Sequence, residues 1–188
     1  MRIRPLCRCA SLAVLVLATA SCGDVVRSGR SPVMLEVTSL VAGGNNTLNS
    51  DVITSAGVIL DDLGTATLTV IPKNIDAITA PTSTNNDVTI TRYRVEYRRA
   101  DGRNTPGIDV PFPFDGAATI TIPAGGSGIL VFELVRHVAK AEAPLVQLVT
   151  DINVISTIAE VTFFGRDQVG NELSASGSML INFLNVGG

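Results

Sequence analysis

Few side chains in this sequence could carry out chemistry. His137 is the single histidine, so a Ser-His-Asp hydrolase would have to use it. No Gly-x-Ser-x-Gly motif, which places a serine nucleophile on a sharp turn, occurs in the chain. A zinc site would also need His137, because no cysteine occurs after Cys22. We therefore expect no catalytic residue and no cofactor, and interpret His137 as a surface residue at a strand end.

Two acidic clusters could bind calcium, which usually takes six or more oxygen ligands. Asp167 and Asn171 lie in an Asp-x-x-Gly-Asn stretch, and their oxygens could surround the ion. The alternative is a hairpin turn in which Gly170 or Asn171 adopts the left-handed conformation. Asp61 and Asp62 form a second oxygen pair, and its alternative is a solvated loop. We interpret both clusters as loops and expect no metal.

An arginine stripe is the largest positive cluster of the chain. Arg92, Arg94 and Arg98 recur at every second or fourth position, so they share one face of a strand. This stripe could dock an anionic glycan, a lipid headgroup or the carboxylates of a partner. Alternatively, the arginines pair with acidic residues on neighbouring strands.

Cys22 comes directly after a segment typical of a secretory leader. Three arginines precede an apolar run over residues 12–18, which is too short to span a membrane. The small residues Ala20 and Ser21 then lead to Cys22, and the stretch 17–22 resembles a bacterial lipobox, with Thr19 where leucine is usual. We expect residues 1–21 to be a lipoprotein signal peptide, and Cys22 to carry the fatty acyl (palmitate-type) membrane anchor.

Composition limits the roles open to the chain after the leader. The net charge is −3, and without residues 1–21 the chain has 11 basic and 17 acidic residues. This acidic balance argues against nucleic-acid binding. Residues 22–32 are polar and Gly/Ser-rich, which indicates a flexible tether. Residues 33–188 suit a single domain, rich in strand-forming and turn-forming residues.

Short strands separated by turn residues predict an antiparallel, Ig-like or fibronectin-III-like β-sandwich of about seven to nine strands with at most one short helix. Tyr93, Val95 and Tyr97 alternate with charged residues, and a β-bulge near Thr91 would bring Val88 and Ile90 to the same face. The expected strands are Val33–Val41, Asp51–Leu60, Thr65–Pro72, Val88–Arg99, Ala117–Pro123, Ser127–Val138, Thr157–Arg166 and Ser176–Asn185.

Two other segments are less regular. Phe112 and Phe114 alternate with prolines, which favours an extended edge segment. These two rings either plug one end of the sandwich or form an exposed recognition edge. A short helix is expected to begin near Pro144, since proline is tolerated in a first turn.

Two stretches carry a resemblance. Residues 164–171 resemble the hairpin that closes many bacterial Ig-like domains, and residues 92–116 are similar to small uncharacterised lipoproteins of soil bacteria. That resemblance implies an Ig-like fold and brings no assigned activity.

The expected role is that of a non-enzymatic structural or binding module, exported and lipid-anchored at Cys22 in the bacterial cell envelope. A non-Asp residue after Cys22 favours the outer membrane in a Gram-negative cell. An envelope protein or a glycan would be its partner. The alternatives are an accessory subunit of an envelope secretion or surface-assembly complex and, as a third option, an envelope hydrolase.

Overall fold

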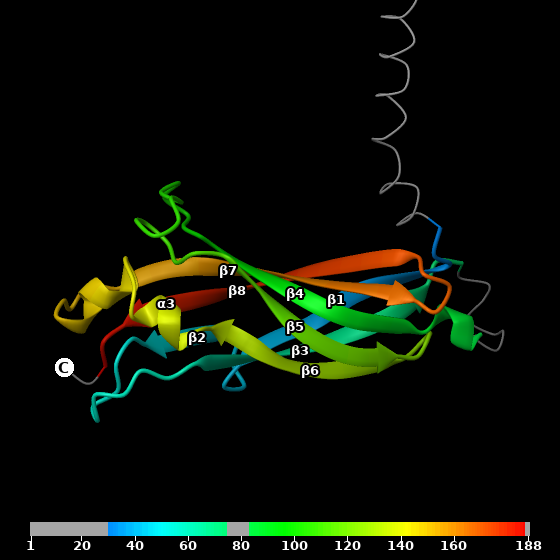
Figure 1. The fold of residues 1–188 in the computed structure, drawn as a ribbon, viewed down its shortest axis with the longest axis horizontal. Helices are drawn as coiled ribbons and strands as arrows, with labels where there is room; N and C mark the ends of the chain where they lie inside the picture. Colours follow the sequence, from blue (N-terminus) through cyan, green and yellow to red (C-terminus); the bar gives the residue numbers. More distant parts are fainter. Residues whose placement is uncertain (1–29, 75–82, 187–188) are drawn as a thin grey trace, which may run out of the picture.

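The computed structural model describes residues 30–74 and 83–186, and these form a mostly β structure (Figure 1). Cys22, the leader and most of the expected tether lie outside the described residues. Eight strands are present: β1 (Val33–Ala42), β2 (Thr47–Asp51), β3 (Asp62–Pro72), β4 (Val88–Arg98), β5 (Phe114–Ile122), β6 (Ser127–Val135), β7 (Ile155–Asp167) and β8 (Glu172–Leu184). The helical segments are short: η3 (Thr84–Asn86), α3 (His137–Lys140) and η4 (Leu145–Val149).

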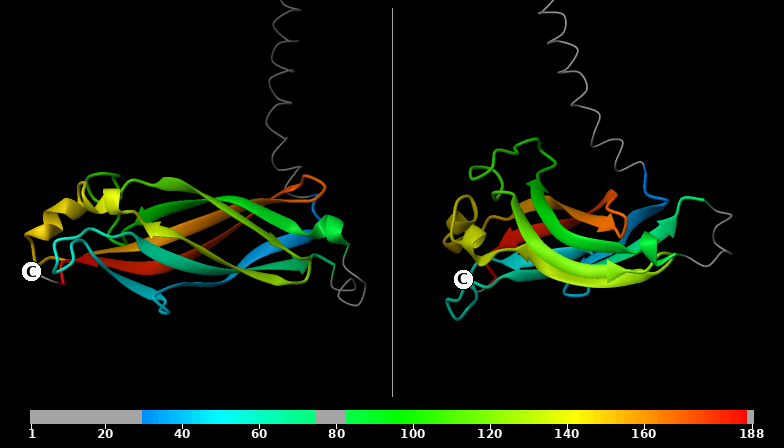
Figure 2. Two further views of the ribbon diagram at one scale, coloured as in Figure 1. Left: turned by 60° about the horizontal axis from the view of Figure 1, so that its bottom comes forward. Right: turned by 45° about the vertical axis from the view of Figure 1, so that its right-hand side comes forward.

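The strands form two sheets that pack face to face (Figure 2). One sheet has the order β1-β3-β6, and the other has the order β2-β8-β7-β4-β5. All pairs are antiparallel except β2 with β8. Gly43 and Gly44, both with positive φ, form a turn after β1, and the chain then continues as β2 in the opposite sheet. The predicted β-sandwich is therefore confirmed.

The long strand β4 shows how the sequence pattern sets the packing. Tyr93, Val95 and Tyr97 are buried between the sheets, and the intervening charged residues face solvent. The register of β4 shifts between Ile90 and Arg92 against both neighbouring strands, so the predicted bulge at Thr91 is confirmed. Without this bulge, the side chain of Ile90 would point to the solvent face.

Aromatic rings form the centre of the core. Tyr93 packs edge-on against Phe132 with ring centroids 5.1 Å apart, and Phe132 packs edge-on against Phe163 at 5.3 Å. The three rings come from β4, β6 and β7, so they join the two sheets. Edge-to-face pairs of this kind add about 0.5–1.5 kcal/mol beyond the burial of their area.

Two predicted elements are wrong in detail. Asp51–Leu60 is not a strand, because β2 ends at Asp51 and the chain then turns, with the Gly57 amide donating to the Thr54 carbonyl at 2.8 Å. The strand expected to reach Val138 ends at Val135, where the chain turns into α3. Both differences arise in loops, where hydrogen bonds from side chains and turns replace the strand ladder.

The helix expected near Pro144 is present as the 3₁₀ segment η4, with Pro144 as its N-cap. This segment packs its buried residues Leu145 and Leu148 against the hydrophobic core. It closes one end of the sandwich, where side chains of the sheets alone would leave the core open to water.

The long axis of the sandwich has two different ends (Figure 1). The described chain enters at Arg30, at the end formed by residues 30–32, 83–87, 123–126 and 168–171, which we call the proximal end. Residues 52–61, 99–113, 136–154 and 185–186 connect or end the strands at the opposite end, which we call the distal end. Hydrogen bonds hold each group together; for example, the Gln168 amide donates to the Asn85 carbonyl, and the Val186 amide donates to Asp51.

Candidate functional site

The arginine stripe lies on the solvent face of the five-stranded sheet, as its spacing predicts. Arg92 and Arg94 both donate to the carboxylate of Asp115, at 3.2 and 2.7 Å. Arg94 also donates to Glu96 at 2.8 Å, and this bond holds the pKa of Glu96 below its ordinary value. The guanidinium of Arg92 additionally lies over the ring of Phe164, 3.6 Å from its centroid. Two of the three predicted anion-binding residues are therefore already engaged by groups of the chain itself.

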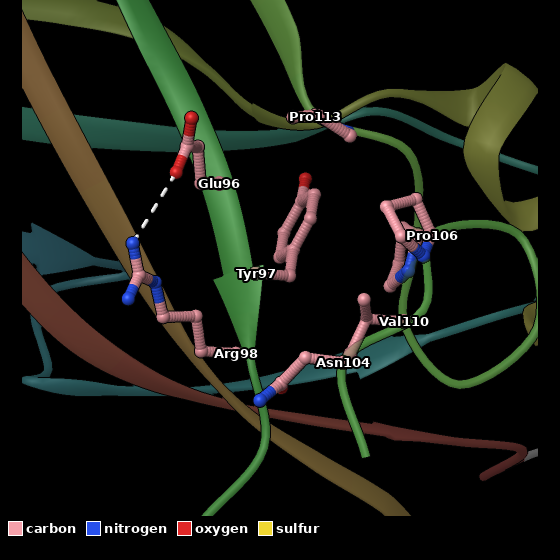
Figure 3. A pocket seen from close by; sticks show the side chains of 8 residues that line it. Glu96, Tyr97, Arg98, Asn104, Pro106, Val110 and Pro113 are labelled. Atoms are coloured by element: carbon pink, nitrogen blue, oxygen red, sulfur yellow. Dashed lines mark ion pairs between the residues drawn. The ribbon is translucent and has the colours of Figure 1, made fainter. Parts of the chain in front are cut away.

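Arg98 differs from the other two members of the stripe. Its nearest carboxylate oxygens belong to Glu96 and Glu160, at 3.6 and 3.5 Å, so its ion pairs are long and loose. It lines a cavity of about 260 Å³ (Figure 3). This cavity lies at the C-terminal end of β4, between the strand and the loop that carries Asn104 and Pro106 (Figure 3).

The chemistry of this cavity is mixed. Pro106, Val110 and two further prolines supply an apolar wall, and Glu96 and Arg98 place opposite charges at its rim (Figure 3). Because the two charges cancel, the cavity has no electrostatic preference for anions.

The loop after β4 contains a second arginine cluster. Asp101 accepts hydrogen bonds from the side chains of Arg99 and Arg103, at distances between 2.7 and 3.2 Å. These bonds, together with the Arg103 backbone amide, hold the pKa of Asp101 well below its ordinary value. One carboxylate thus orders two arginines in this loop and offsets one of their two charges.

His137 lies at the N-terminus of α3 with 58% of its side chain exposed, which agrees with a surface position. Its Nδ1 is 2.8 Å from the carboxylate of Asp61, and its backbone amide donates to the same oxygen. This hydrogen bond from the backbone amide of His137 is the main cause of the lowered pKa of Asp61. The His137 ring therefore pairs with Asp61 at the surface of the protein.

Asp62 takes part in a buried network that sequence reasoning missed. Lys140 is 1% exposed. Its Nζ forms an ion pair with Asp62 at 2.9 Å and donates a hydrogen bond to the Asp51 carbonyl at 2.9 Å. The buried hydroxyl of Ser50 donates to the same Asp62 oxygen at 2.6 Å. The network joins α3 to the end of β2 and the start of β3, so it fixes the distal end. A lysine within a four-residue helix carries no pattern that predicts burial.

Asp167 and Asn171 form a closed hairpin turn. The backbone amides of Val169 and Asn171 donate to Oδ1 of Asp167 at 3.1 and 2.8 Å, and the Asn171 side chain donates to Oδ2 at 2.7 Å. Gly170 has a φ of +94°, as the hairpin alternative predicts. Both Asp167 oxygens are thus used by donors within the turn. No group of three or more metal-ligating side chains occurs in the part of the chain that the structure describes.

The two phenylalanines between prolines have different roles. Phe114 is buried at the start of β5, 4.1 Å below the guanidinium of Arg136, so it plugs the sandwich. Phe112 is more than half exposed. Its ring lies against Gly107, whose positive φ of 75° and missing side chain allow this close approach. The plug therefore applies to Phe114. Phe112 is exposed, and its role in recognition stays a prediction.

Exposed apolar side chains concentrate at the distal end. Of the sixteen large hydrophobic residues that are exposed among the described residues, nine lie in the distal segments and one, Val169, lies at the proximal end. Ile152 is the extreme case, since 99% of its surface is exposed. The nine are Val58, Leu60, Ile108, Phe112, Val138, Val146, Ile152, Val154 and Val186.

Comparisons with known proteins add little to this geometry. The sequence matches no protein-family model and no curated protein. Among solved structures, the chain is similar to one titled "X-ray structure of Northeast Structural Genomics Consortium target SoR45", with 14% identity and a TM-score of 0.38. The match covers 83% of this chain and 88% of that one. In the described residues, no helix has the length and apolar character needed to cross a membrane.

Proposed function

We propose that this chain is a non-enzymatic binding module with an Ig-like β-sandwich, anchored in the bacterial cell envelope by lipid on Cys22. The leader and the stretch before Cys22 support the anchor. The outer membrane is the favoured location in a Gram-negative cell. An envelope protein is the proposed partner, and it binds the end of the domain that faces away from the membrane.

The concentration of exposed apolar side chains at the distal end carries this proposal. Single exposed apolar residues are ordinary, but a group of them on loops at one end is typical of an interaction surface. The described chain enters at the proximal end, so an anchored domain directs the distal loops away from the lipid. The distal end therefore has the position and the surface that a partner-binding site needs.

The charged face of the larger sheet is a weaker candidate for this role. Its arginines are paired with acids of the same face, most closely through Asp115 and Glu96. A partner that binds by charge would first have to displace these internal ion pairs. Apolar contacts at the distal end need no such exchange.

The anchor is tested by mass spectrometry of the protein purified from bacterial membranes. The expected N-terminus is an acylated Cys22, and the Cys22→Ala variant is expected to leave the membrane fraction. An N-terminus without acyl groups, or a Cys22→Ala variant that remains in the membrane fraction, would contradict the anchor.

Partner binding is tested separately by chemical crosslinking in intact cells. Ile152→Lys with Val154→Lys is expected to abolish a discrete crosslinked product that contains a second, different protein, because two charges then occupy the apolar loop. Val169→Lys, a matched change at the proximal end, is expected to leave the product unchanged. Equal amounts of this product from the wild type and from both variants would rule out the distal end as the binding site.

A further inference from the structure

The sandwich has four outer strands, and three of them are poor templates for pairing with another chain. β1 is interrupted by a bulge between Val37 and Ser39. β2 has only five residues, and four of them are polar. The pairing of β5 with β4 is broken by a register shift, and Asp115 of β5 is engaged by two arginines. These are the features by which natural sheets prevent edge-to-edge association.

β6 is the exception among these outer strands. It has nine residues, without lysine, arginine or proline, and its register against β3 shifts only at its last residues. Ile129 is 67% exposed and Val131 is 59% exposed, both on the outer face of the sheet. β-branched apolar side chains of this kind favour strand pairing.

The backbone of β6 shows which groups are free. The Val70 amide and carbonyl point toward the chain just before β6, where they bond to Gly126 and Gly125. Backbone hydrogen-bonding groups alternate in direction along an antiparallel strand. The amide and carbonyl of Leu130 therefore point toward β3, and those of Ile129 and Val131 point away from it. Among residues 30–74 and 83–186, no backbone group pairs with Ile129 or Val131 on that side.

The next residue along this edge is already satisfied. The amide of Glu133 donates to the hydroxyl of Tyr93 at 3.2 Å. This bond confirms the direction of the alternation, because it also leaves the strand on the side away from β3. The free backbone groups of this edge therefore belong to Ser127, Ile129 and Val131.

We propose that β6 pairs antiparallel with β6 of a second copy of this chain, about a two-fold axis at Leu130. In this register Ile129 lies opposite Val131 of the second copy, and the reverse pair arises by symmetry. Each pair exchanges two hydrogen bonds, so the free backbone groups of Ile129 and Val131 are all used. The outer side chains form two contacts between isoleucine and valine, which stabilise such pairs.

Charge also favours this register. Glu133 is the one charged residue of β6, and it lies opposite Ser127 of the second copy rather than opposite its own equivalent. The Glu133 amide, which Tyr93 already occupies, then lies at the end of the pairing, opposite Ser127. An axis at Val131 would place it opposite Ile129. The axis at Leu130 thus leaves the two pairs between Ile129 and Val131 complete.

The pairing does not depend on the proposed function. In the pair the two distal ends point in opposite directions, so the orientation described above for the anchored domain applies to a single copy. The distal loops lie at the far end of each copy, so the interface leaves them uncovered. Val33 lies opposite Pro72, and Thr69 lies opposite Ser127. Val33, the start of β1, is therefore about six residues, ~20 Å, from the axis along the strand direction, and the two copies place it on opposite sides of the axis. A tether of residues 22–32 spans at most ~36–40 Å, which lets both anchors reach one membrane.

The test is the mass in solution of the full chain in density-matched detergent, measured by sedimentation equilibrium. The expected value is twice the mass of one chain. Val131→Lys and Ile129→Lys are each expected to halve it, because a charge then faces its apolar partner across the axis. Met34→Lys, on the same outer face but on β1, is expected to leave the pair intact. Thermal unfolding measured by circular dichroism verifies that each variant is folded.

Amide hydrogen exchange gives an independent measure that involves no partner-binding or lipidation assay. The amides of Ile129 and Val131 are expected to exchange slowly in the pair and quickly in folded Val131→Lys, while that of Leu130 is slow in both. A monomeric wild type, or a dimer in which Ile129 and Val131 exchange quickly, would overturn the proposal. A dimer that folded Val131→Lys also forms would overturn it equally.

Discussion

The buried lysine at the distal end is the most informative place to perturb this fold. Lys140→Met keeps most of the aliphatic stem but removes the ammonium group, which bonds to Asp62 and to the Asp51 carbonyl. Removing one partner of a fully buried pair costs about 3–5 kcal/mol, because the other charge remains buried and unpaired. Asp62 is about one-fifth exposed, so water offsets part of this cost.

The expected destabilisation is therefore about 2–4 kcal/mol, of which the lost bond to the Asp51 carbonyl contributes about 1 kcal/mol. The assay is urea unfolding of the purified chain, measured by circular dichroism. The double variant Lys140→Met with Asp62→Asn is expected to be more stable than Lys140→Met alone. Asparagine removes the unpaired charge and still accepts the hydrogen bond from Ser50.

The surface pair Arg166–Glu172 provides the control. Its atoms are 2.9 Å apart, the same distance as in the buried pair, but both side chains are exposed. Arg166→Met is expected to cost less than about 1 kcal/mol. If Lys140→Met costs no more than Arg166→Met, or if the Asp62→Asn change brings no recovery, the stabilising role assigned to the buried network is wrong.

Three further outcomes are expected from the same unfolding assay. Gly165→Ala should cost about 1–3 kcal/mol, because the new methyl would lie 2.7 Å from the Thr89 carbonyl oxygen; an unchanged midpoint would refute this packing. Burial raises the pKa of Tyr97, so its stabilisation is present below about pH 10 and is lost at higher pH; Tyr97→Phe should flatten the alkaline profile. Desolvation raises the pKa of Asp167, but hydrogen bonds from Asn171 and neighbouring groups outweigh it and lower the pKa overall. Stability should therefore fall as the pH drops below about 4, and Asp167→Asn should reduce that dependence.

The sheets could be predicted because their residues alternate. In β4, the change of phase at Thr91 locates the bulge, and in β6 the pattern places Leu130 and Phe132 in the core. Alternation is a local property of a strand, so it can be read from a single sequence.

The distal end could not be predicted in the same way. Val58, Ile108 and Ile152 are separated by about fifty residues each, and none has a periodic neighbourhood. Their location at the same end depends on the order of the strands, because every second connection returns to that end of the sandwich. Lys140 was missed for a related reason, since its acceptors are at Asp51 and Asp62 on other strands.

The arginine stripe shows how a correct structural prediction can still leave the function undecided. The spacing of Arg92, Arg94 and Arg98 predicts that they share a face, and they do. Whether such a face binds an anion depends on the neighbouring strands, which supply Asp115 and Glu160. These acids cancel the positive charge, so the face stabilises the sheet without favouring a charged ligand. The exposed apolar side chains of the distal end and the free edge of β6 are surfaces that the chain does not satisfy by itself, and this is why we assign the proposed contacts to them.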